Sequence, residues 1–92
     1  MSRAAQDLEL IRRIVAGEEA ALRALLAAHQ ARVYRFALRL VGNAAVAEEV
    51  MNEVFLEVWR NAGKFEGASA PSTWILSIAH HRAVRNDVAL DP

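Results

Sequence analysis

The sequence has no cysteine, two prolines and four glycines among its 92 residues. Without cysteine the chain cannot form a disulfide, a thiolate metal site or a cysteine nucleophile, which fits an intracellular protein, and we expect it to be cytoplasmic. It also has no apolar run long enough to span a membrane, and its first ten residues lack the apolar core of a signal peptide. Hydrophobic residues make up 54% of the chain, which is enough for one small domain with a buried core.

The chain carries no excess of either charge. Lys and Arg number 11, and Asp and Glu also number 11. Binding to nucleic acid draws on counterion release by many cationic contacts, so a neutral chain should bind DNA poorly on its own. Any DNA-binding role must therefore be local or depend on a partner.

No stretch alternates like a β-strand, and apolar residues instead recur at spacings of three and four. The pattern predicts an all-α protein: a compact bundle of four helices forming a single domain over residues 1–92. We expect Asp7 to cap the first helix, Asn43 to cap the third, and Gly63 to end the third in a left-handed turn. Residues 87–92 should form a fraying end or the start of a linker. The expected helices span residues of about 8–16, 18–41, 44–62 and 72–86.

The third predicted helix separates into an apolar arc and an acidic arc when its residues are placed 100° apart. Leu56 interrupts the acidic arc, and Trp59 lies at its boundary. An apolar residue ringed by carboxylates is typical of a docking surface, because apolar anchors within polar rims carry most interface energy. The alternative is that both residues pack beneath another helix, and the sequence leaves this open for Trp59 above all. The acidic arc comprises Glu48, Glu49, Asn52, Glu53, Glu57 and Arg60.

The remaining polar residues form no catalytic constellation, and we expect neither an enzyme nor a cofactor. His80 and His81 are adjacent on a helix and point apart, so they should not share a metal ion, and no metal site is expected. On the second helix Arg32, Arg35 and Arg39 form a basic ridge, interpreted as a solvated face. His29 is interpreted as a half-buried helix residue without special chemistry.

The segment 64–70 is predicted to be a loop, with Pro71 favouring a helix start just after it. Phe65 could stack on a base, and nearby serine and histidine side chains could bond base edges or phosphates. The alternative is that Phe65 packs into the core beneath the loop, as loop aromatic residues often do.

Taken in order, these segments resemble the region-2 domain of bacterial sigma-70 family RNA polymerase sigma factors of the extracytoplasmic function (ECF) group. The resemblance covers about Asp7 to Arg85. It is carried by Leu10-Ile11 with Gly17, Val33-Tyr34-Arg35-Phe36-Ala37, Ala47-Glu48-Glu49-Val50, Glu53-Val54-Phe55-Leu56-Glu57-Val58-Trp59-Arg60, Phe65 with Gly67, Ser72-Thr73-Trp74 and Ile78-Ala79.

The resemblance implies that the third helix docks on the clamp helices of the RNA polymerase β′ subunit. The residues expected to bind polymerase are Glu48, Glu49, Asn52, Glu53, Leu56 and Glu57. It also implies that the loop and fourth helix recognise the minus-ten promoter element and hold a flipped base of the non-template strand, which helps to melt the duplex. The residues expected to bind DNA are Arg60, Lys64, Phe65, Gly67, Ser69, Ala70, Pro71, Ser72, Thr73, Ser77, His80 and His81.

The sequence also departs from the family pattern. Val46 stands where the family commonly has Asp, Asn52 replaces Gln, and Glu66 adds a negative charge to the loop. An alternative is therefore a sigma-like decoy, an interaction module that binds an anti-sigma factor without recognising a promoter. An anti-sigma factor is an expected partner under either hypothesis, and a third possibility is an unrelated helical scaffold.

Overall fold

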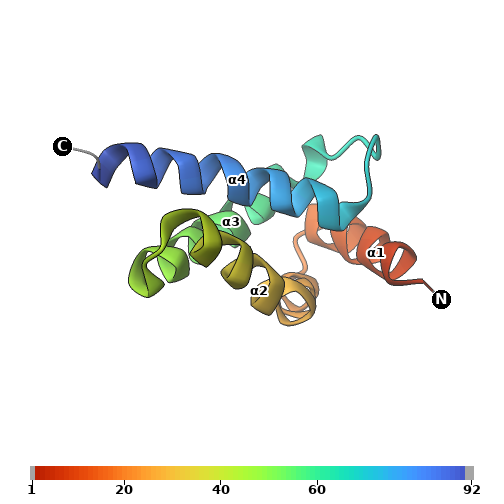
Figure 1. Cartoon of the computed structure of the whole chain (residues 1–92). Helices are drawn as coiled ribbons and strands as arrows, with labels where there is room; N and C mark the ends of the chain where they lie inside the picture. Colours follow the sequence, from red (N-terminus) through yellow and green to blue (C-terminus); the bar gives the residue numbers. More distant parts are fainter. Residues whose placement is uncertain (1, 91–92) are drawn as a thin grey trace.

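The computed structural model describes the backbone of residues 2–90 and the side chains of residues 2–86. Within them lie four α-helices, α1 (Arg3–Val15), α2 (Glu19–Val41), α3 (Ala44–Asn61) and α4 (Pro71–Leu90), and a 3₁₀ turn, η1 (Ala62–Lys64). The described residues form no strand. In Figure 1, α4 runs across α2 and α3, and α1 lies at the end of the molecule opposite the C-terminus. The predicted all-α bundle is confirmed.

The first helix begins five residues earlier than predicted, because Ser2 and not Asp7 is its cap. The Ser2 side chain accepts a hydrogen bond of 3.2 Å from the backbone N–H of Ala5. Asp7 lies inside α1 with its side chain 1% exposed. Its Oδ2 lies 2.8 Å from Nε2 of His29 on α2, and its Oδ1 lies 3.1 Å from Nε of Arg3.

His29 is also more than the half-buried residue expected from the sequence, since it is 4% exposed and partners this carboxylate. The Asp7–His29 pair therefore ties α1 to the middle of α2.

The junctions between helices depend on residues that can adopt special backbone conformations. Gly42 ends α2 with φ of 68°, and its N–H donates to the Leu38 carbonyl at 2.8 Å. The predicted cap of α3 is confirmed, since Asn43 Oδ1 accepts from the N–H of Val46 at 3.0 Å. The predicted left-handed turn at Gly63 is wrong: α3 passes directly into η1, and the next glycine with positive φ is Gly67, at 77°.

The last helix is longer than predicted. It begins at Pro71, as the proline suggested, but continues to Leu90 instead of ending near residue 86. Residues 87–90, which were predicted to be a fraying end or the start of a linker, continue the helix. Residues 91–92 of that predicted tail lie outside the described residues.

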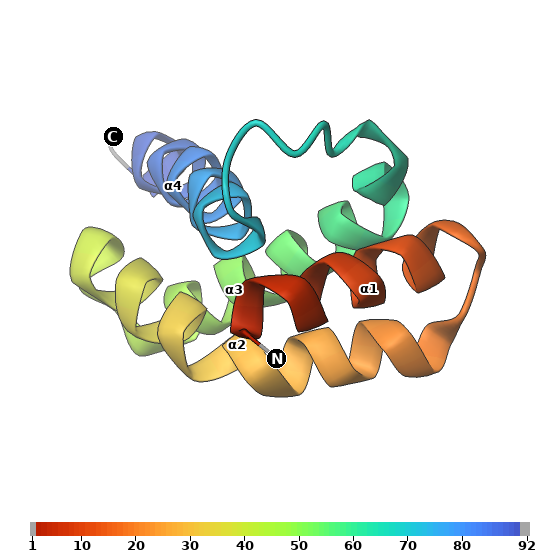
Figure 2. The ribbon, with the colours of Figure 1, turned by 90° about the vertical axis from the view of Figure 1, so that its right-hand side faces the viewer.

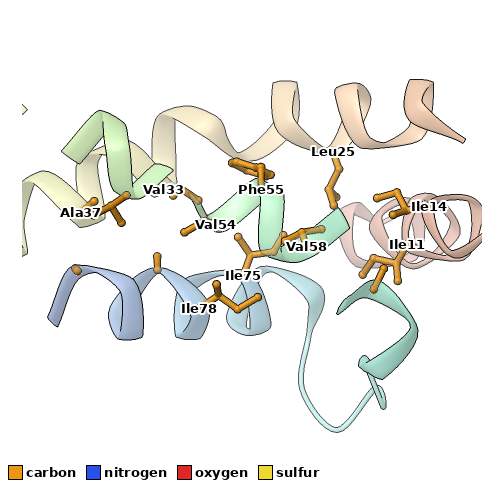
Figure 3. Close-up of a cluster of buried hydrophobic side chains, with 14 of the residues drawn as sticks. Ile11, Ile14, Leu25, Val33, Ala37, Val54, Phe55, Val58, Ile75 and Ile78 are labelled. Atoms are coloured by element: carbon orange, nitrogen blue, oxygen red, sulfur yellow. The ribbon is translucent and has the colours of Figure 1, made fainter. Parts of the chain in front are cut away.

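The hydrophobic core fills the space between all four helices. Figure 3 shows labelled core side chains from each helix converging, with Leu25 of α2, Val58 of α3 and Ile75 of α4 among them. Figure 2 shows α1 lying along the first half of α2, where Ile11 and Ile14 reach this core. No helix of the described chain is both long and apolar enough to cross a membrane. The packing leaves one side of α3 free to face solvent.

Candidate functional site: the outer face of α3 and the loop before α4

Leu56 lies on the outer side of α3 and is 48% exposed, although it is a large apolar residue. The burial of the opposite side of the helix explains this position. Val54, Phe55 and Val58 are buried in the core, so Leu56, on the opposite side of the helix, is turned outward. Around Leu56, the side chains of Glu48, Glu49 and Asn52 are exposed, and those of Glu53 and Glu57 are half-buried. The structure therefore brings the six residues predicted to bind polymerase onto one face.

Two grooves meet at Leu56. The first, of about 420 Å³, lies between α2 and α3 and has a largely apolar lining. The second, of about 280 Å³, lies between α3 and α4 and is polar. Leu56 thus stands on a ridge with an apolar groove on one side and a charged groove on the other. The first groove is lined by Glu19, Leu22, Arg23, Leu26, Asn52, Phe55, Leu56 and Trp59, and the second by Glu53, Leu56, Glu57, Arg60, Asn61 and Arg82.

Trp59 packs against the core, as one of its two interpretations required, and its role in docking stays a prediction. Its side chain is half-buried and packs against the core, and it also lines the apolar groove beside Leu56. The sequence did not indicate that Leu22 and Leu26 complete this groove. Their spacing of four residues indicated an apolar side of α2, but it did not indicate that α3 lies beside that side.

Two carboxylates of the face are held by α4. Arg82 Nε donates to Glu57 Oε1 at 3.0 Å, and Arg82 Nη2 donates to the same oxygen. Asn86 Nδ2 approaches Glu53 Oε2 at 3.5 Å. These contacts fix the side chains of Glu53 and Glu57 along the polar groove. Arg60, which was predicted to bind DNA, lines the same groove as Glu53 and Glu57, which were predicted to bind polymerase.

The loop of residues 65–70 connects η1 to α4 and carries most of the small residues predicted to bind DNA. Phe65 is half-buried against the core, and its ring centroid lies 5.1 Å from that of Trp74. This contact supports the packing interpretation of Phe65 and anchors the loop at its first residue. The residues exposed in this region include Lys64, Gly67, Ser69, Ala70, Thr73, Ser77, His80 and His81.

Other residues of the predicted DNA-binding set have structural partners. Pro71 is buried at the start of α4 and Ser72 is half-buried. The hydroxyl of Ser77 donates to the carbonyl of Trp74 at 2.6 Å. The rings of His80 and His81 lie 6.1 Å apart, and both point to solvent. The loop and the exposed side of α4 therefore present mainly polar residues to solvent.

Comparison with known proteins shows which class of protein this fold and surface define. Residues 25–86 match the family model of sigma-70 region 2. The match covers α3, the loop, and most of α2 and α4, and the chain belongs to this family.

Several proteins that are similar to this chain are ECF sigma factors. The chain is 39% identical over 84 residues to the ECF RNA polymerase sigma factor SigK of Mycobacterium bovis (strain BCG / Pasteur 1173P2) and of Mycobacterium tuberculosis (strain ATCC 25177 / H37Ra). These alignments cover 89% of the chain and 45% of each relative. It is 36% identical over 80 residues to SigK of Mycobacterium sp. (strain KMS), covering 85% of the chain and 42% of the relative.

The resemblance to a region-2 domain of an ECF sigma factor is confirmed. The chain spans less than half the length of the curated relatives that it matches.

Proposed function

We propose that this domain acts in transcription initiation as the promoter-recognition domain of an ECF sigma factor. In this proposal the outer face of α3 docks on the clamp helices of the polymerase β′ subunit. The loop of residues 65–70 and the exposed side of α4 hold the non-template strand of the minus-ten element, which stabilises the melted duplex. The observation that carries the docking step is the exposure of Leu56 on a ridge between an apolar groove and a charged groove that holds Glu53 and Glu57.

The surface has the composition of an interface hot spot. Leu56, Trp59 and the apolar groove offer area that can be removed from water, while Glu48, Glu49 and Glu53 supply a polar rim. A partner with basic residues around an apolar patch would complement this face, because carboxylates exclude acidic partners and favour basic ones.

Docking is tested by pull-down of a β′ clamp-helix fragment with Leu56→Ala. Truncating a central anchor typically costs about 2 kcal/mol or more, which corresponds to roughly 30-fold weaker binding. Leu8→Ala is the matched control, because Leu8 is 41% exposed and lies on α1, away from this face. Equal binding by the wild-type chain and the Leu56→Ala variant would refute the docking proposal.

Promoter recognition is tested with core polymerase present, since the neutral chain should bind DNA weakly alone. A pool of random single-stranded oligonucleotides is selected on the complex, and the enriched sequences are measured again with a Thr73→Ala/His80→Ala variant. Both side chains are exposed on α4. We expect a short enriched motif and a loss of its binding in the variant.

The decoy is a second candidate function, favoured by Glu66, which is exposed in the loop and would repel phosphate. A decoy would bind an anti-sigma factor and enrich no DNA motif in the presence of polymerase. The same selection therefore separates the two functions, and Glu66→Gln should strengthen DNA binding if the promoter-recognition function is correct.

A further inference from the structure

The charges of this neutral chain are unevenly distributed among its helices. After Arg23 the sequence has no acidic residue until Glu48, yet this stretch contains Arg32, Arg35 and Arg39. The acidic residues of α3 follow immediately, at positions 48, 49, 53 and 57. The second half of α2 is therefore a basic element, and α3 is an acidic one.

The three arginines share a groove with α4. Arg32, Arg35, Phe36 and Arg39 line a groove of about 220 Å³, which Leu76 of α4 completes. The arginines are exposed, and the Phe36 and Leu76 side chains that accompany them are half-buried. Within residues 2–86, the ion pairs involve other arginines: Arg3, Arg12, Arg13, Arg23 and Arg82.

The spacing of the arginines suits a polyanion. They recur at intervals of three and four residues, so they lie along one face of α2. Arg32 and Arg39 are seven residues apart, about 10 Å along the helix axis at 1.5 Å per residue. Over that distance one strand of a duplex carries about three phosphates. Three cations held together on an exposed face repel one another, and a row of phosphates would relieve this repulsion.

The groove also continues the surface that we propose for DNA. Leu76 lies three residues after Thr73 and four residues before His80, so these residues share a face of α4. Thr73 and His80 are exposed and belong to the predicted DNA-binding set. A strand that contacts this face of α4 would have the arginines of α2 beside it.

We propose that Arg32, Arg35 and Arg39 form a second DNA contact, which binds the phosphate backbone of a strand without reading its sequence. The inference rests on the proposed function for the identity of the polyanion. The arginines of α2 would add a DNA contact to those proposed for the loop and α4. Their role would be positioning, because phosphate contacts fix the register of a strand whose bases are read elsewhere.

The test is the salt dependence of binding to a labelled thymidine oligonucleotide, measured by fluorescence anisotropy on the 92-residue chain. The groove variant is Arg35→Gln/Arg39→Gln, and the matched control is Arg12→Gln/Arg13→Gln. Both variants remove two positive charges, and the control side chains, which are 75% and 41% exposed, lie on α1. Circular dichroism first establishes that each variant unfolds at the wild-type temperature.

The slope of log K against log salt should change by about 1.4 in the groove variant, at roughly 0.7 per single-strand phosphate contact. If the binding constant extrapolated to 1 M salt is the same for the variant and the wild type, this change in slope corresponds to about 25-fold weaker binding of the variant at 0.1 M salt. The control should lose less than about twofold. Arg39→Gln alone should give about half the change in slope.

Several results would overturn the inference. Equal losses in the two double variants would show an effect of net charge alone, and no binding by the wild-type chain at low salt would exclude the contact. Loss of binding to phosphatidylserine vesicles with unchanged DNA binding would assign the groove to a membrane instead. The groove variant should still capture the β′ clamp fragment, so failure here is distinguishable from failure of the docking proposal.

Discussion

Replacing His29 with leucine would leave the buried carboxylate of Asp7 without its imidazole partner. The two side chains are 5% and 1% exposed, and they join α1 to α2 across 22 residues of sequence. Breaking a buried pair by removing one partner typically costs about 3–5 kcal/mol, because the remaining group is desolvated without compensation. Arg3 still lies 3.1 Å from the other Asp7 oxygen, so we expect the lower end of this range, about 3 kcal/mol.

Such a loss is large for a domain of this size. At roughly 4–8 °C per kcal/mol, the unfolding temperature should fall by about 12–24 °C. Urea unfolding followed by circular dichroism gives the free energy directly, and the slope m should stay unchanged if only stability is affected.

A double variant distinguishes the energy of the Asp7–His29 pair from the effect of the substitutions on packing. In Asp7→Leu/His29→Leu both polar groups are replaced by apolar ones, so the stability lost in His29→Leu should be at least half recovered. Arg3→Gln is the control for the exposed partner and should cost less than about 1 kcal/mol. A change below about 0.5 kcal/mol for His29→Leu would refute the argument that this pair holds α1 in place.

Four further changes test other parts of the fold by urea unfolding. Asn43→Ala should cost about 1 kcal/mol by removing the α3 cap, whereas Asn52→Ala on the exposed face of that helix should cost almost nothing. Gly42→Ala should cost about 1–2 kcal/mol because φ is 68°, and Gly63→Ala, where φ is not positive, should be close to neutral. Leu25→Ala should cost about 2–5 kcal/mol because the side chain is 0% exposed, while Leu8→Ala should change stability by less than about 0.5 kcal/mol. Glu57→Gln should cost less than about 1 kcal/mol and less still in high salt, since its pair with Arg82 is partly exposed; a larger loss would show that α4 depends on this pair.

The sequence predicted α3 best because most turns of this helix carry apolar residues on one side and charged residues on the other. Valines at intervals of four marked the buried side, and the carboxylates marked the outer side, so Leu56 stood out as an apolar residue facing solvent. Helix ends were harder to predict where two residues could serve the same purpose. Ser2 and Asp7 are both good caps, and only the burial of Asp7 against His29 decides between them.

The rest of the site depended on contacts between residues far apart in the sequence. Arg82 reaches Glu57 across 25 positions, and Leu22 meets Leu56 from a different helix. Periodicity reports which side of one helix is apolar, but not which helix lies beside it. The same limit applies to Arg32, Arg35 and Arg39, whose shared groove exists only because Leu76 of α4 packs near them.

Because the carboxylates of α3 and the arginines in the second half of α2 lie on different helices, we expect the domain to have an electric dipole although its net charge is zero. A uniform field exerts no pull on such a molecule, but it does exert a torque. Near a large charged assembly, the domain would turn before contact so that its negative side leads toward cations and its positive side toward anions. A neutral domain with such a dipole is therefore oriented during its approach and is not attracted over a long range. Added salt screens the field, so it should slow productively oriented encounters more than it slows encounters in random orientations.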